Sequence, residues 1–186
     1  MLAVTQAILT GTLSNQELAE AINGRLRAIA RANAKLSGLV EKSASLEELV
    51  RDELWPFATD ARAGLAGPVV QLTGDVARNI ALVIHELTTN SVKYGALSND
   101  RGAVRVEWTF KDDQCIMFWR ERDGPTVTPP AATGYGSRMI KASLAAIGGS
   151  IKTEFCSDGF ACEFSFRVLL PVPRDNSPRY RPVAPA

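Results

Sequence analysis

The segment of residues 75–94 restricts the fold more than any other part of this sequence, because its apolar and polar residues recur with the period of an α-helix. At about 100° per residue, five residues fall on one side of the helix and form a core-facing stripe: Ala77, Ile80, Ile84, Leu87 and Ser91. Glu86, Asn90 and Lys93 form a polar row well away from that stripe, and Gly95 supplies a helix stop. The segment therefore predicts a long helix that packs on a core and presents a polar row elsewhere.

The polar row offers three chemical groups that suit a triphosphate. The carboxylate of Glu86 can take a proton, the carboxamide oxygen of Asn90 can bind Mg²⁺, and the ammonium of Lys93 can neutralise phosphate charge. The alternative is a solvated helix face stabilised by pairing between residues four apart. The spacing alone leaves both interpretations open.

Two other segments carry residues that suit a nucleotide. Gly134 and Gly136 precede a helix that begins near Ser137, where backbone N–H groups and the helix dipole favour an anion; the alternative is a simple tight turn. Trp119 and Glu121 lie at a strand end, where the carboxylate can accept a hydrogen bond from an adenine amino group or can simply lie at the surface. No GxxxxGK[ST] segment is present, which excludes a P-loop site.

The segments around the long helix predict strands and one further helix. Residues 103–111 alternate apolar and polar side chains, as a half-buried strand does, and a turn leads into a second strand over residues 114–121. The other predicted elements are a short strand at residues 69–72, a loop rich in Pro and Gly at 122–133, a helix at 137–147, and a hairpin of strands at 151–156 and 160–169 with Phe160, Cys162, Phe164 and Phe166 on one face.

The first part of the chain predicts a helical hairpin. Residues 1–12 have helical spacing, and Ser14 with Glu17 forms a capping-box pattern that opens a helix to about residue 40. The longer helix carries an apolar stripe that needs a partner: Leu18, Ile22, Leu26, Ile29 and Leu36.

A second capping box follows this hairpin. Ser45 and Glu48 open a short helix that must stop near Pro56, because proline cannot continue a helix. At the other end of the chain, residues 174–186 are rich in proline and offer little that can be buried. This predicts a disordered tail.

Composition narrows the class of protein further. Lys and Arg number 21 and Asp and Glu 20, so there is no electrostatic reason to expect a nucleic-acid surface or an anionic-membrane partner. No apolar run approaches the roughly 18 residues that a membrane-spanning helix needs. Three cysteines without metal-ligand spacing indicate reduced thiols in a cytoplasm. The single histidine, His85, argues against a histidine-based triad or a multi-histidine metal site.

Three motifs resemble those of the HWE histidine kinases, a family named for a His, a Trp and a Glu. Residues 85–98 are similar to the family's N-box, residues 119–121 to its G1 box, and residues 134–140 to its G2 box. The three naming residues are all matched: His85, Trp119 and Glu121. The resemblance covers residues 1–170, and its motifs are specific.

The resemblance implies an α+β protein in two parts: a helical hairpin for dimerisation at residues 1–44 and a Bergerat-type (GHKL) α/β sandwich that binds ATP and Mg²⁺ at 45–170. The composition of the last residues adds a disordered tail at 171–186. It further implies transfer of the γ-phosphoryl group of ATP to a histidine and then to an aspartate on the receiver domain of a response regulator. A cytoplasmic homodimer is expected, without nucleic acid and without a membrane contact in this chain.

The resemblance also implies roles for the polar row. Asn90 would bind Mg²⁺, Glu86 would act as the acid or base, and Lys93 would lie near phosphate. His85 belongs to the same catalytic helix and would lie beside the nucleotide pocket. In this family it is not the phosphoacceptor.

The implied nucleotide-binding residues come from all three motifs: Asn90, Lys93, Trp119, Glu121, Gly124, Gly134, Gly136 and Ser137. Glu121 would read the adenine. Residues 134–140 would hold the phosphates, and residues 122–133 would form a lid over the nucleotide.

Two features depart from the family pattern. Asp123 stands where the G1 box usually has glycine, so its carboxylate either weakens ATP binding or points outward. Residues 1–8 resemble the helix that follows the family's phosphoacceptor histidine. The acceptor is therefore expected to be absent from this chain, through truncation or as a natural variant.

The residues leave two rival functions open. The first is a degenerate kinase that docks a partner without turnover; Asp123 and the absent acceptor favour it, whereas an intact Glu86, Asn90 and glycine pair argues against it. The second is a Bergerat ATPase of the chaperone or gyrase sort, which the Trp119 and Glu121 pair and the N-terminal hairpin disfavour.

Overall fold

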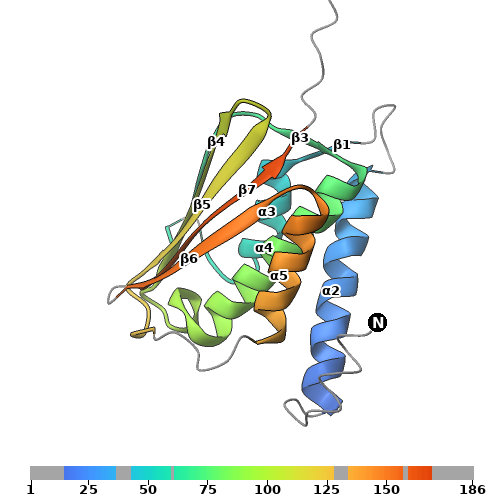
Figure 1. Cartoon of the computed structure of the whole chain (residues 1–186). Helices are drawn as coiled ribbons and strands as arrows, with labels where there is room; N and C mark the ends of the chain where they lie inside the picture. Colours follow the sequence, from blue (N-terminus) through green and yellow to red (C-terminus); the bar gives the residue numbers. More distant parts are fainter. Residues whose placement is uncertain (1–14, 37–42, 60, 128–133, 157–158, 169–186) are drawn as a thin grey trace, which may run out of the picture.

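The computed structural model of the protein describes residues 15–36, 43–59, 61–127, 134–156 and 159–168. These residues form a five-stranded sheet with helices packed on one of its faces, as Figure 1 shows. Helices and a mixed sheet occur together, which confirms the α+β prediction. Among the described residues, no helix combines the length and the apolar character that crossing a bilayer requires.

The sheet has the strand order β2-β4-β5-β7-β6. Its members are β2 (Ala63–Ala66), β4 (Ala103–Lys111), β5 (Gln114–Arg122), β7 (Gly159–Arg167) and β6 (Ser150–Cys156). β2 runs parallel to β4, and every other neighbouring pair is antiparallel. The β4–β5 hairpin turns at Asp112, which has a positive φ of 57°.

The inner face of the sheet supplies one side of the hydrophobic core. Alternate residues of the three long strands are buried there: Val104, Val106, Trp108, Cys115, Met117, Trp119, Cys162, Phe164 and Phe166. Side chains of a strand alternate between the two faces, so this burial follows from the alternation in the sequence. The predicted shared face of the last strand is confirmed, with Phe160 half-buried at its start.

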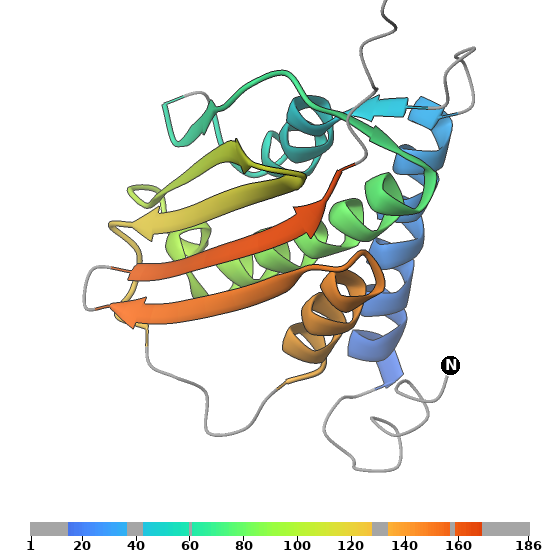
Figure 2. The same cartoon turned by 45° about the horizontal axis from the view of Figure 1, so that its top comes forward.

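Helix α4 (Gly74–Tyr94) lies across this inner face beside α5 (Tyr135–Ala146), as Figure 2 shows. All five residues of the predicted apolar stripe of α4 are buried. Helix α3 (Leu46–Leu54) begins as the capping box predicts, because the Ser45 side chain accepts a hydrogen bond from the backbone N–H of Glu48, and it ends before Pro56. After α4, Gly95 leads into the short 3-10 helix η1 (Ala96–Ser98).

Helix α2 (Asn15–Leu36) forms an outer layer, packed on α4 from the side away from the sheet (Figures 1 and 2). Its buried side chains are small or lie at its end: Ala28, Ala32 and Leu36. Leu26, which belongs to the predicted apolar stripe, is 58% exposed. Because Ala32 and Leu36 belong to the same hydrophobic cluster as the sheet residues, α2 shares a core with the rest of the fold.

The structure differs from the sequence predictions in its short strands. The strand expected at residues 69–72 is β3 (Gln71–Thr73), which pairs with the unpredicted β1 (Ser43–Ser45) in a separate two-stranded sheet. β2 was also not predicted. The helix at 1–12, the cap at Ser14, the end of the lid loop and the tail at 171–186 lie outside the described residues, and the division at residue 44 stays a prediction.

Candidate functional site

Residues from two predicted motifs meet where α4 passes the first turn of α5. Glu86 and Asn90 lie one turn apart on α4, and Gly136 lies at the start of α5. A Cβ placed on Gly136 would lie 2.8 Å from Oε2 of Glu86 and 3.9 Å from Oδ1 of Asn90. The absence of a side chain at this glycine therefore lets α5 approach the two polar groups closely.

Arg25 of α2 also contacts this cluster. Its Nε lies 2.6 Å from Oε1 of Glu86, and its guanidinium stacks on the Tyr135 ring at 4.5 Å from the centroid. Glu86 is only 5% exposed, so this member of the polar row does not lie on a solvated helix face, whereas Asn90 is half-buried and Lys93 is exposed. Nη1 of Arg25 is buried without a hydrogen-bond partner among the described residues.

Glu121 forms a second buried polar centre at the end of β5. Its carboxylate accepts hydrogen bonds from the backbone N–H of Ala96 at 2.7 Å and from Nε1 of Trp119 at 2.9 Å, and Ser91 donates a third. Burial raises the pKa of Glu121 above its ordinary value, and these three hydrogen bonds oppose that rise. The carboxylate thus joins the end of α4 to the end of β5.

Two glycines allow the chain to close around this carboxylate. A Cβ on Gly95 would overlap Oε2 of Glu121, and a Cβ on Gly124 would lie 2.7 Å from the Cα of Ala96. The end of the N-box and the G1 box are therefore in direct contact. Asp123, which immediately precedes Gly124, is exposed and has a positive φ of 57°, a conformation that glycine adopts more readily.

His85 points away from the Glu86 cluster. Its Nδ1 lies 2.9 Å from Oε2 of Glu53 on α3, and Arg31 of α2 forms an ion pair with the same carboxylate. Burial would raise the pKa of Glu53, but the hydrogen bonds from His85 and Arg31 outweigh it and hold that pKa below its ordinary value. A Cβ on Gly24 would lie 2.7 Å from Nε2 of His85, so the ring packs directly against α2.

The structure brings some predicted site residues together and leaves others apart. Glu86, Asn90 and Gly136 meet, whereas Lys93 is exposed and forms no ion pair with any described residue. Gly134 faces open space, and Ser137 is half-buried in the first turn of α5.

Sequence reasoning missed the arginine on α2. Arg25 lies between apolar residues of a predicted hairpin helix, where a charged residue normally faces water. The adjacent Gly24 is the signal that could have revealed it, because a glycine inside a helix often marks a close packing contact.

The fold is that of histidine kinase catalytic domains. The histidine kinase domain of a blue-light-activated kinase from Erythrobacter litoralis is similar over 80% of this chain and 79% of that chain, with a TM-score of 0.62 and 15% identity. The catalytic domain of histidine kinase ThkA is similar over 67% and 95%, with a TM-score of 0.53 and 17% identity. These likenesses confirm the predicted GHKL-type fold.

Residues 1–69 match the model of the HWE histidine kinase family. Blue-light-activated histidine kinase 1 of Erythrobacter litoralis (strain HTCC2594) is 30% identical over 162 residues, which are 83% of this chain and 45% of that protein. The blue-light-activated histidine kinase of Brucella ovis is 32% identical over 182 residues, which are 92% of this chain and 36% of that protein. The chain belongs to the HWE histidine kinases, and it spans less than half the length of these relatives.

Proposed function

We propose that this chain binds ATP with Mg²⁺ and transfers the γ-phosphoryl group to a histidine presented by another helix. The observation that carries the proposal is the meeting of Glu86, Asn90 and Gly136, whose segments are far apart in the sequence. A carboxylate, a carboxamide oxygen and a glycine at a helix start are the groups that phosphoryl transfer uses for proton transfer, metal binding and phosphate binding.

The residues at this cluster fit the implied nucleotide and metal. Asn90 and Glu86 offer oxygen ligands of the kind that Mg²⁺ prefers, and the absence of a side chain at Gly136 brings the start of α5 close to them. Bound Mg²⁺ would supply neutralisation of phosphate charge. In the proposal, Glu86 takes the proton of the incoming group, and Ser137 and Lys93 contact phosphate.

The Glu121 corner is proposed to receive the adenine. Trp119 and Gly124 shape the corner, and Glu121 would accept a hydrogen bond from the adenine amino group. Its carboxylate oxygens already accept three hydrogen bonds, so adenine recognition requires a further acceptor position on it or the exchange of one donor. Because Gly95 and Gly124 let the chain pack closely around Glu121, such an exchange would also move the end of α4.

The acceptor and the partners belong to the proposal as well. His85 is the single histidine among the 186 residues, and its ring is held between Glu53 and α2. It is therefore proposed as a positioning residue, so this chain should acquire no acid-labile phosphohistidine from labelled ATP. Phosphohistidine on His85 would overturn that assignment. A homodimer through the exposed side of α2 and a response regulator as phosphoryl acceptor complete the proposed function.

Calorimetry with a non-hydrolysable ATP analogue tests the nucleotide site. Asn90→Ala should remove the tightening of analogue binding by Mg²⁺ and leave the melting temperature of the free protein nearly unchanged, because Asn90 lies off the buried stripe of α4. Asn79→Ala is the matched control on the same helix, since the Asn79 side chain bonds to the backbone oxygen of Asp75 and to no other described residue. Unchanged Mg²⁺ dependence in Asn90→Ala would remove that residue from its role.

The same titration separates the proposal from a docking module without turnover. A docking module would bind the analogue weakly or not at all, with or without Mg²⁺. Asp123 was the residue that favoured this alternative, and its exposed position in the corner leaves the Glu86 cluster unobstructed. We therefore expect Mg²⁺-dependent binding by the wild-type chain.

A further inference from the structure

We propose that Arg25 is a positioning residue that keeps Glu86 covered while α2 lies on α4, so that catalysis requires the arginine to withdraw. The inference rests on the proposed function, because it assigns a regulatory state to the same carboxylate. It adds a contact between the outer helix and the centre of the site that the motifs do not contain.

Access to Glu86 is restricted in the observed arrangement. Oε1 is bound by Nε of Arg25 at 2.6 Å, and Oε2 faces the backbone at Gly136. The Arg25 side chain is itself only 12% exposed and is backed by the Tyr135 ring. A general base must come within about 2.6–3.2 Å of the group that gives up its proton. Oε1 is thus occupied and Glu86 is only 5% exposed, so an incoming histidine ring has little access to the carboxylate while Arg25 is in place.

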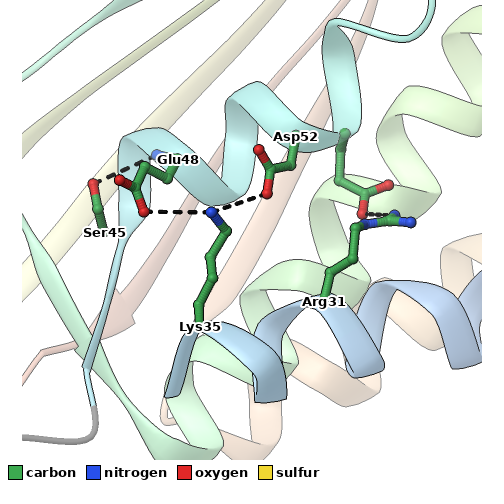
Figure 3. A network of polar contacts seen from close by, with 6 residues as sticks. Arg31, Lys35, Ser45, Glu48 and Asp52 are labelled. Atoms are coloured by element: carbon green, nitrogen blue, oxygen red, sulfur yellow. Dashed lines mark hydrogen bonds and ion pairs between the residues drawn. The ribbon is translucent and has the colours of Figure 1, made fainter. Parts of the chain in front are cut away.

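One face of α2 packs on α3 and α4 through small residues and cations. Gly24, Ala28 and Ala32 bring the helix close, and cations at helical spacing flank them. Arg31 pairs with Glu53, and Lys35 lies 3.0 Å from Asp52 and 3.4 Å from Glu48, as Figure 3 shows. Arg25 is the member of this cationic face that reaches the site.

The contact of α2 with α4 is weaker than the contact of α4 with the sheet. Its buried side chains are mostly alanines, which contribute little apolar area compared with the sheet side of α4. Nη1 of Arg25 and Nε of Arg31 are buried without hydrogen-bond partners among the described residues. An unmet buried donor costs about 1–3 kcal/mol, so the docked arrangement is only shallowly stable.

The test compares Arg25→Met with Arg27→Met in the full chain. Met keeps an unbranched apolar stem in both places, and Arg27 is exposed on α2 and forms no ion pair with any described residue. Transfer of labelled phosphate from ATP with Mg²⁺ to a histidine supplied on a separate helical polypeptide gives kcat and KM, and hydrogen exchange reports on α2. We expect Arg25→Met to raise kcat about fivefold or more, as a coupling of about 1 kcal/mol implies, and Arg27→Met to leave it unchanged.

Two further variants keep the test decisive. Adding Glu86→Ala to Arg25→Met should abolish the gain, since the gain depends on the freed carboxylate. Should Arg25→Met fail to fold, Arg25→Lys retains the charge but lacks the planar fork, and a smaller rise in kcat is expected. A fall or no change in kcat overturns the inference, because it would make Arg25 a phosphate contact or a purely structural residue. Absence of analogue binding by the wild type would instead overturn the proposed function.

Discussion

The two sides of α4 are held by different kinds of contact. Toward the sheet, Ile80 and Ile84 are fully buried in one hydrophobic cluster with Trp119 and Phe164. Toward α2, the contacts are small residues and ion pairs, among them the pair of Arg25 and Glu86. Large apolar side chains stabilise a contact by about 1.5–3 kcal/mol each, whereas an ion pair roughly balances its desolvation.

The difference assigns the two sides different tasks. The sheet side fixes the position of the polar row, because its large side chains cannot separate without unfolding the domain. In the arrangement proposed above, the α2 side sets the electrostatic surroundings of that row and changes while the domain stays folded. Under this proposal, the Glu86 carboxylate lies between a permanent contact with the sheet side and a releasable contact with α2. It can then be covered and uncovered while the core stays packed.

The largest effect is expected from the sheet side. Phe164→Ala removes a ring that is 1% exposed and should lower the free energy of unfolding by about 4 kcal/mol. Leu26→Ala is the control on α2, where an exposed side chain should change the value by less than about 0.5 kcal/mol. Urea unfolding of the three proteins measures both. Similar losses in the two variants would contradict the contrast between the sides.

A smaller, pH-dependent effect is expected from Glu53, which joins α2 to α3 and α4. Its lowered pKa means that its carboxylate stabilises the fold above its unfolded pKa, and that this stability is lost as the pH falls through the folded value. Glu53→Gln should therefore cost about 2 kcal/mol near neutral pH, and the gap should close as the pH falls below the ordinary value of 4.5. Glu47→Gln, at an exposed ion pair, is the control. A gap independent of pH would show that charge is not the cause.

Added salt should lower the stability of the α2 contact but not of the sheet contact, and this effect should be smaller than that of Glu53→Gln. Raising sodium chloride to about 1 M shortens the screening length to about 3 Å. The free energy of opening α2 should fall by about 1 kcal/mol, while amides of β5 and β7 remain unaffected. Hydrogen exchange at Ala28 and Ala32, compared with Met117 and Phe164, measures this. An equal change at all four positions would indicate one cooperative unit and no separate release of α2.

The smallest effect is expected at Asp123, which belongs to neither side. Its φ of 57° suits glycine better, so Asp123→Gly should raise the free energy of unfolding by about 0.5 kcal/mol. Because the side chain is exposed, exchange in α2 should not change. Thermal unfolding measures the gain. A loss of stability would show that a contact of the Asp123 carboxylate stabilises the fold by more than the relief of backbone strain does.

Periodicity in the sequence was enough to predict α4 and the three long strands, because each has one face that must be buried. It failed at β2, where only Leu65 is a large side chain and the parallel pairing with β4 bridges distant segments. In the site, helical spacing predicted the row of Glu86 and Asn90. The contact of Arg25 with Glu86 joins residues 61 positions apart, and no local pattern contains it.

Gly24 also bears on what happens to α2 once it leaves α4. The glycine lies inside a helix of 22 residues, where it is about 1 kcal/mol less favourable than alanine. While the ring of His85 fills the space beside it, close packing offsets that weakness. A separated α2 has no such compensation, so its first turns should shift from helix toward coil. Departure and unwinding would then be one event, and the gain in chain entropy would favour the open state more as temperature rises.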